Sequence, residues 1–201
     1  MEHLNHQLFS WINATPDSPA WLLAFATFLA RDVILIVPLL IVGLWLWGRP
    51  ESIDSQRELA CKALIALCFA MASTTSISML FPHARPFVEG FGYTFLHHAP
   101  DDSFPSDHGT AMFTFALTFL CWHRVWSGVV LMVIACAIAW SRVYLGVHWP
   151  LDMVGGLLVG GVGCLVAQLV WNLFGPAIAP ALARLYRLCF ALPIRKGWTK
   201  H

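Results

Sequence analysis

Three short polar segments interrupt an otherwise apolar chain. They are PHARPF at 82–87, SFPSDHGT at 103–110 and SRVYLGVHWPLD at 141–152. Each segment falls at the end of an apolar run, so we expect one face of a helical bundle to collect all three. Together they supply cations, small hydrogen-bond donors and histidines near a carboxylate: Arg85, Ser106, His108, Arg142, His148 and Asp152. Such a set suits the binding of a phosphate group and nucleophilic attack on its phosphorus.

The third segment places a histidine and a carboxylate at the start of one helix. Pro150 suits the first helical turn, so His148 would lie at the helix entrance. Asp152 follows four residues later, where it can face the imidazole and fix its tautomer, which leaves the other ring nitrogen to attack phosphorus. Arg142 can donate two hydrogen bonds to a phosphate. The alternative is an interfacial histidine, with the carboxylate merely complementing the helix dipole.

The second segment has the features of an anion site at a helix N-terminus. Ser106 is a natural N-cap, and the N–H groups of Asp107, His108 and Gly109 would point outward where the dipole favours negative charge. The His108 side chain would project at the same mouth and can protonate a leaving oxygen. Pro-Ser-Asp is also ordinary capping chemistry. Arg85, after the preceding apolar run, can reach the same face, and the joint arrangement favours a phosphate site.

The elements that position these segments are membrane helices. The 201 residues are 58% hydrophobic and 11% charged, with a mean hydropathy of +0.68, which is outside the usual range of soluble domains. We predict an all-α polytopic membrane helix bundle of about five to six transmembrane helices, forming a single domain over 1–201. The apolar runs predict five spans, at 20–47, 60–81, 108–122, 126–142 and 151–174. The tail, 176–201, is predicted to be a cytoplasmic amphipathic helix, with a sixth span as the alternative.

The distribution of lysine and arginine predicts the orientation. With five spans, nine of these residues fall on one side, which should be the cytoplasm: Arg49, Arg57, Lys62, Arg124, Arg184, Arg187, Arg195, Lys196 and Lys200. Arg85 and Arg142 then lie at the outer face, while Arg31 lies within the first span. The N-terminal residues lack the features of a signal peptide, so we expect the first apolar helix to remain in the mature protein. The candidate site would therefore face outward.

The three segments resemble the signature of the type 2 phosphatidic acid phosphatase superfamily, which spans 78–152 here. Pro105-Ser106-Asp107-His108 is similar to the second part of that signature, and Ser141-Arg142 with His148 and Asp152 is similar to the third, at the right spacing. Within the superfamily, the stretches FPHARPFVEGFGYTFLHHAPDDSFPSDHGT and AWSRVYLGVHWPLDM resemble bacterial undecaprenyl-diphosphatases of the bacitracin-resistance type.

The resemblance implies an activity and roles for individual residues. The substrate would be undecaprenyl diphosphate, an isoprenoid lipid diphosphate whose dephosphorylation recycles the carrier lipid of cell-wall synthesis at the outer, periplasmic face of the bacterial inner membrane. His148 would become phosphorylated, Asp152 would orient it, and His108 would be the general acid. Phosphate would be held by Arg85, Ser106 and Arg142, and the chemistry requires no metal or cofactor.

One position departs from the superfamily pattern. Seven residues before Arg85, where the superfamily usually has lysine, this chain has Ser78. His83 and Arg31 are candidates for the missing cation, the latter because an ionisable residue inside a span is a functional candidate. Glu89, in the following outer loop, is a further candidate for substrate contact. His97 and His98, in the same loop, are candidates for substrate contact as well, but for all three residues the favoured expectation is solvation.

Other functions predict different features. A phosphatase of another lipid, such as phosphatidylglycerophosphate or phosphatidate, would keep the same motifs. A transport subunit would place polar groups at mid-membrane rather than at helix ends. Net charge of +1 without a long basic tract gives no indication of nucleic acid as a partner, and we expect none. A metal-dependent hydrolase would use as ligands His83, His97, His98, His108 and Asp101 or Asp102. The spacings of these residues do not place them on one helical face, which argues against this alternative.

Overall fold

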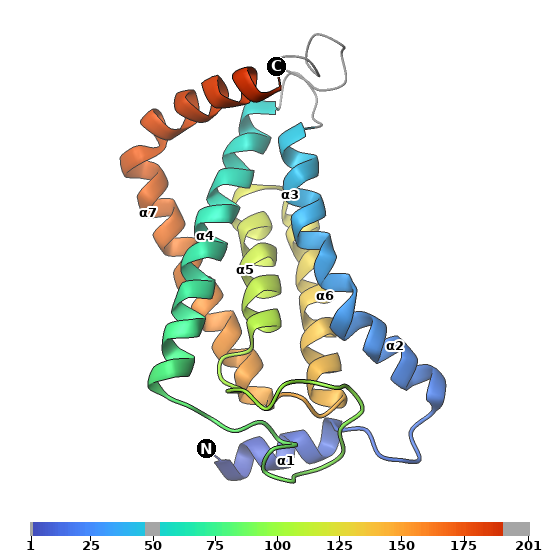
Figure 1. The fold of residues 1–201 in the computed structure, drawn as a ribbon. Helices are drawn as coiled ribbons and strands as arrows, with labels where there is room; N and C mark the ends of the chain where they lie inside the picture. Colours follow the sequence, from blue (N-terminus) through green and yellow to red (C-terminus); the bar gives the residue numbers. More distant parts are fainter. Residues whose placement is uncertain (1, 47–52, 191–201) are drawn as a thin grey trace.

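A computed structural model describes residues 2–46 and 53–190, and within these residues all regular structure is helical. The fold class predicted from the sequence is confirmed. Figure 1 shows a bundle with a short helix across one end, called here the α1 end. The helices are α1 (Glu2–Ile12), α2 (Ala20–Arg31), the 3-10 helix η1 (Val33–Leu35), α3 (Ile36–Leu46), α4 (Ile53–Leu80), α5 (Asp107–Trp122), α6 (Val125–Tyr144) and α7 (Pro150–Cys189).

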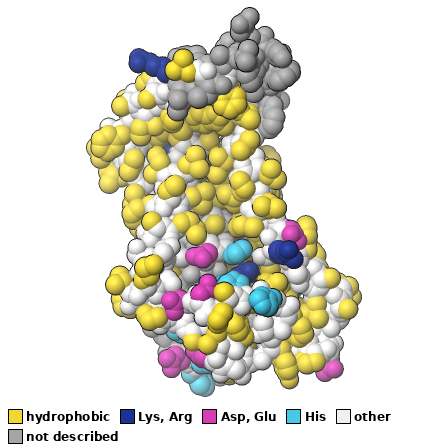
Figure 2. Space-filling model, in the orientation of Figure 1, with side chains coloured by type: hydrophobic (Ala, Val, Ile, Leu, Met, Phe, Trp, Pro, Cys, Tyr) yellow, Lys and Arg dark blue, Asp and Glu magenta, His cyan; other side chains and the backbone are white. Residues whose placement is uncertain are grey.

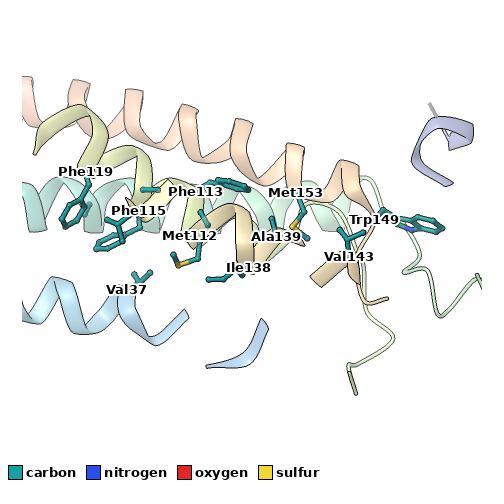
Figure 3. Close-up of a cluster of buried hydrophobic side chains, with 14 of the residues drawn as sticks. Val37, Met112, Phe113, Phe115, Phe119, Ile138, Ala139, Val143, Trp149 and Met153 are labelled. Carbon is teal, nitrogen blue, oxygen red and sulfur yellow. The ribbon is translucent and has the colours of Figure 1, made fainter. Parts of the chain in front are cut away.

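Helix α5 forms the centre of the bundle and contacts α4, α6 and α7. Figure 3 shows Met112, Phe115 and Phe119 of α5 in the apolar core, with Val37 of α3 and Ile138 of α6 near them. Small residues let α7 approach closely, as is typical of membrane helix pairs. A Cβ on Gly156 would lie only 2.7 Å from the Thr110 nitrogen. This contact brings the first turns of α5 and α7 together.

Four segments of the described chain are long and apolar enough to cross a membrane: Ala20–Leu46, Ile53–Leu80, Val125–Tyr144 and Pro150–Arg184. They correspond to four of the five predicted spans, and the protein is a multi-pass membrane protein. The fifth, α5, has 16 residues, fewer than the roughly 20 needed to cross a bilayer alone. It is surrounded by longer helices instead of meeting lipid on all sides.

Three predicted helix boundaries were wrong. The run at 60–81 begins earlier, because α4 starts at Ile53. The run at 20–47 is not one helix, because η1 separates α2 from α3. Pro38 lacks the N–H that would bond the Ile34 carbonyl, which explains an interruption there. The run at 151–174 continues as α7 to Cys189, with Pro176 and Pro180 inside the helix. Figure 1 shows α7 bending and turning across the end opposite α1, as expected for internal prolines.

Helix α1 was not predicted. Its 11 residues are too few to register as an apolar run, and only Asn5 and Phe9 are buried. The Phe9 ring packs 5.0 Å from that of Trp149, between centroids. The Asn5 side-chain oxygen accepts a hydrogen bond from the Leu151 N–H at 3.1 Å, one of the N–H groups that a helix start leaves without an internal partner. Helix α1 therefore supports the beginning of α7. Within the predicted tail, residues 191–201 lie outside the described chain.

Candidate active site

The three polar segments meet at the α1 end of the bundle. The first follows α4, the second leads into α5, and the third joins α6 to α7. Two backbone hydrogen bonds connect them, from Ser103 N to His83 O at 2.8 Å and from Ser106 N to Asp152 O at 3.2 Å. Figure 2 shows acidic, basic and histidine side chains gathered near this end, below a largely hydrophobic surface.

His148 and Asp152 face each other in the interior. Nδ1 of His148 lies 3.2 Å from Oδ2 of Asp152, and the two side chains are only 2% and 1% exposed. The same carboxylate oxygen accepts the Trp149 N–H at 2.8 Å, which fixes the carboxylate at the first turn of α7. The predicted arrangement, in which Pro150 starts the helix, is therefore present.

The surroundings of the His148 ring define its tautomer. Nδ1 faces oxygen acceptors, Asp152 Oδ2 and the Ser103 carbonyl at 3.1 Å. Nε2 lies 2.9 Å from Nη1 of Arg85, a group that can only donate. Nδ1 therefore carries the hydrogen and Nε2 carries the lone pair. Burial lowers the pKa of His148 well below its usual value, and the charges of Arg142 and Arg85 lower it further. The neutral imidazole has the form that a nucleophile requires.

Arg85 directs all three of its nitrogens at protein acceptors. Its Nε donates to Asp101 Oδ1 at 2.8 Å, its Nη1 also donates to the Val147 carbonyl at 2.9 Å, and its Nη2 donates to the Asp102 carbonyl at 3.1 Å. The side chain is buried. Arg85 is thus at the predicted face, but in this arrangement its donors hold a loop and His148.

Arg142 has the opposite character. It is 3% exposed, and its one hydrogen bond to a described residue, from Nη1 to the Ala30 carbonyl, is long at 3.5 Å. Nε and Nη2 are buried and have no partner among the described residues. An unsatisfied buried guanidinium is costly, so this group is suited to an anion that completes its hydrogen bonds.

The start of α5 offers two free backbone N–H groups to an anion, and not the three that the sequence predicted. Ser106 is the N-cap, but its hydroxyl accepts the Gly109 N–H at 3.2 Å. Asp107 and His108 retain their N–H groups at the helix start. The Asp107 side chain is exposed, whereas that of His108 is half-buried and within electrostatic range of Arg142, His98 and Arg85. His108 therefore lies at the same end of the bundle as the other predicted site residues.

Three further candidates lie outside this cluster. His83 packs against Trp149, with ring centroids 6.4 Å apart, and its Nδ1 has no partner among the described residues. Glu89 is exposed and lies 3.9 Å from His6 on α1. Arg31, at the end of α2, is exposed. It adjoins the site only in sequence, because it follows the Ala30 carbonyl that Arg142 contacts.

Sequence reasoning missed three residues that the structure brings to the site. Ser103 is fully buried, and its hydroxyl donates to Asp152 Oδ2. Ser103 lies in the segment 103–110, where the sequence pattern predicts a helix cap at Ser106 and gives no signal for Ser103. His98 and Asp101 belong to the loop before α5, where the prediction for His98 was solvation. The spacing of loop residues carries no periodic signal, so only the fold could place them.

The histidines and acids do not form a metal centre in the described part of the chain. No group of three or more metal-ligating side chains occurs within residues 2–46 and 53–190. His83 faces Trp149 and His97 is exposed, so the ligand set of the metal-dependent alternative is not assembled.

Comparison with known proteins agrees with the geometry. Residues 59–176 match the model of the PAP2 superfamily. The chain is 60% identical over 200 residues to a protein of Escherichia coli, YbjG, provisionally named an undecaprenyl-diphosphatase, covering 100% of this chain and 99% of that one. It is 28% identical over 156 residues to the undecaprenyl-diphosphatase BcrC of Bacillus subtilis, covering 78% of each.

Solved structures show the same fold. The crystal structure of Aquifex aeolicus LpxE matches with a TM-score of 0.65 at 27% identity, over 82% of this chain and 94% of that one. A PAP2-type phosphatidylglycerolphosphate phosphatase from Bacillus subtilis matches with a TM-score of 0.62 at 18% identity, over 83% and 84% of the two chains. The chain therefore belongs to the PAP2 superfamily and is a multi-pass membrane member of it.

Proposed function

We propose that this protein is a lipid phosphatase that hydrolyses undecaprenyl diphosphate to undecaprenyl phosphate and inorganic phosphate. The names of YbjG and BcrC support this substrate, since the first relative covers the whole chain. The reaction would recycle the carrier lipid of cell-wall synthesis in a bacterial inner membrane.

The observation that carries the proposal is the pair of unpartnered Arg142 nitrogens beside a neutral buried histidine. A phosphate group would supply the missing acceptors for Nε and Nη2. The N–H groups at the start of α5 would support the same anion. A site with these donors around a nucleophile performs phosphoryl transfer by positioning and by neutralising charge.

The reaction would proceed in two steps. The lone pair of His148 Nε2 forms a bond to the terminal phosphorus, and the bond from that phosphorus to the bridging oxygen breaks. His108 donates a proton to the departing lipid monophosphate. Water then attacks the phosphohistidine, His108 takes up its proton, the N–P bond breaks and phosphate leaves. Asp152 holds the imidazole in one tautomer throughout, and no metal takes part.

The distribution of charge supports an outward-facing site. Arg57 and Lys62 at the start of α4, Arg124 before α6 and Arg184 near the end of α7 lie toward helix ends that are remote from α1. Cytoplasmic loops carry the excess of lysine and arginine. The α1 end, with the candidate site, would then face the periplasm.

Phosphate release by the purified protein in detergent tests the proposal. The substrate panel contains undecaprenyl diphosphate, farnesyl diphosphate, phosphatidate and phosphatidylglycerophosphate, each with and without a chelator. We expect the isoprenoid diphosphates to be cleaved fastest and the chelator to have no effect. Faster cleavage of phosphatidate or phosphatidylglycerophosphate would reassign the substrate, and loss of activity with chelator would overturn the metal-free chemistry.

A pair of arginine variants tests the anion site itself. Arg142→Ala should lower kcat/KM at least about 100-fold, since hydrogen bonds to charged groups are each worth about 1.5–3 kcal/mol and two nitrogens are unpartnered. Arg124→Ala is the matched control, because Arg124 is exposed at the opposite end of the bundle. Equal activity of the two variants would contradict the role of Arg142 in binding the phosphate, on which the proposal rests.

A further inference from the structure

We propose that His98 determines the preference for a diphosphate by binding the phosphate group that stays on the lipid. This inference rests on the proposed function and extends it to the choice between lipid diphosphate and lipid monophosphate. The loop between α4 and α5 supplies His98, outside the segments that carry the nucleophile and the acid.

The position of His98 is that of a second ligand group beside the nucleophile. Its side chain is only 21% exposed, and its ring lies 6.1 Å from that of His148, between centroids, at an angle of 75°. It is within electrostatic range of Arg85 and Arg142. A phosphate held by Arg142 next to His148 would therefore have His98 on a neighbouring side, where the second phosphate of a diphosphate can reach it.

The hydrogen bonds of His98 leave one nitrogen for a ligand. Nδ1 lies 3.1 Å from the Ala99 carbonyl and 3.5 Å from Asp101 Oδ1. Both neighbours are acceptors, so Nδ1 carries hydrogen. Nε2 has no hydrogen bond with another described residue and can donate to a phosphate oxygen once it is protonated.

Asp101 connects His98 to Arg85. The same Oδ1 atom that faces His98 accepts the Arg85 Nε–H at 2.8 Å. The loop is thus attached to the catalytic cluster by an ion pair, which places the His98 imidazole on the site and not in solvent. Asp101 acts as a positioning residue for His98.

The surrounding charges suit a histidine that gains its proton with the substrate. Burial lowers the pKa of His98; the Ala99 carbonyl and Asp101 raise it, whereas Arg85 and Arg142 lower it. A bound diphosphate neutralises the arginines and would raise the pKa again. A lipid monophosphate has no second phosphate between the transferred group and the lipid, so His98 should stabilise its binding less. The other titratable groups near the ring are Asp107, His108 and His148.

The test compares farnesyl diphosphate with farnesyl phosphate, which share a tail, in wild-type protein and three variants. His98→Ala removes the ring, and His98→Asn keeps a donor toward Ala99 but cannot carry a charge. His97→Ala is the control, because His97 is the exposed neighbour of His98. We expect both His98 variants to lower kcat/KM for the diphosphate by about 10- to 100-fold more than for the monophosphate, as for one charged hydrogen bond.

Each alternative result overturns the assignment. Equal losses on both substrates in the Asn variant, which leave the ratio of the two kcat/KM values unchanged, would mean that His98 only supports the loop. Unchanged kcat/KM values on both substrates would mean that it does not contact substrate. If the Ala variant does not fold, the Asn variant decides. Wild-type protein that cleaves neither undecaprenyl diphosphate nor farnesyl diphosphate would refute the proposed function itself. Active wild-type protein with an unchanged ratio of the two kcat/KM values in the variants would refute only the role of His98.

Discussion

Nη1 of Arg85 lies 2.9 Å from Nε2 of His148, the ring nitrogen opposite Asp152. The lone pair that would attack phosphorus is therefore directed at an arginine in the unliganded arrangement. Arg85 remains in place because Asp101, Asp102 and Val147 accept its other hydrogen bonds. A phosphate oxygen that competes for Nη1 would leave Nε2 available to attack. Binding of the substrate would then, in the same step, release the Nε2 lone pair of His148 from Arg85.

The first prediction concerns the covalent intermediate. His148→Ala should abolish turnover, because it removes the Nε2 lone pair of the imidazole that Asp152 orients. Wild-type protein incubated with labelled substrate should retain a phosphoryl group after an alkaline quench and lose it in acid, as a phosphoramidate does. A variant with more than a few per cent of wild-type activity would exclude His148 as the nucleophile.

The second prediction concerns Ser103. Its hydroxyl donates to Asp152, and its carbonyl faces His148 Nδ1. Ser103→Ala should lower kcat about 10-fold with little change in KM, because one hydrogen bond to a charged group is lost while phosphate ligands remain. Ser76→Ala is the control, since Ser76 is an exposed serine whose hydroxyl donates to the carbonyl of Ala72 in its own helix. A rise in KM alone would contradict this positioning role.

The part of the site carried by helix ends was predictable from the sequence. The spacing of His148 and Asp152 matches one helical turn, and Ser106 has the residue type of an N-cap, so local rules place them correctly. The protein acceptors of Arg85 were not predictable, because they include the carbonyls and carboxylate of a loop 16 residues and more along the chain. Irregular backbone has no period from which such contacts follow.

The same distinction applies to the fold. Apolar runs located the helices, since burial in lipid requires sustained hydrophobicity. They did not indicate that α5 is interior or that α7 continues past Pro176, because hydropathy does not distinguish lipid-facing from protein-facing residues. Helix α1 escaped notice because its stability comes from tertiary contacts of Asn5 and Phe9, which composition does not record.

The third prediction follows from the pKa of His148. Burial, reinforced by Arg142 and Arg85, lowers the folded-state pKa well below 6.5, so the unfolded chain binds one more proton than the folded chain once the pH falls below about 6.5. This contribution to stability is complete above that pH and is lost on acidification, by up to about 1.4 kcal/mol per pH unit. When the pH is lowered from 7 to 5.5, the free energy of unfolding in detergent should fall more for wild-type protein than for His148→Gln. Parallel curves would mean that His148 is charged in the folded protein.

The fourth prediction concerns sidedness. A cysteine at Thr94, exposed in the loop between α4 and α5, should react with an impermeant thiol reagent in intact spheroplasts once the native cysteines are replaced. One at Ser55, exposed near the start of α4, should react only after lysis. Gly92 is unsuitable for such labelling, because a Cβ there would lie 2.5 Å from Asn13 Oδ1 and Phe9 Cε1. The reverse pattern would place the site in the cytoplasm and exclude recycling at the outer face.

The fifth prediction concerns His108 as the general acid. Cleavage of a diphosphate releases a lipid monophosphate, which is a weaker base than the alkoxide released from a phosphate monoester, so its departure needs less protonation. General acid assistance is typically worth about 100- to 10,000-fold. His108→Ala should therefore lower kcat/KM distinctly more for farnesyl phosphate than for farnesyl diphosphate.

This selectivity is opposite in sign to that expected for His98, although His98 and His108 lie within electrostatic range of each other. A His108 ring that mainly bound phosphate would instead cause equal losses on the two substrates, and its assignment as the acid would be withdrawn. His148→Ala supplies the control, because the nucleophile is needed for both substrates alike. The two histidine variants measured on one pair of substrates thus separate proton donation to the leaving group from recognition of the second phosphate.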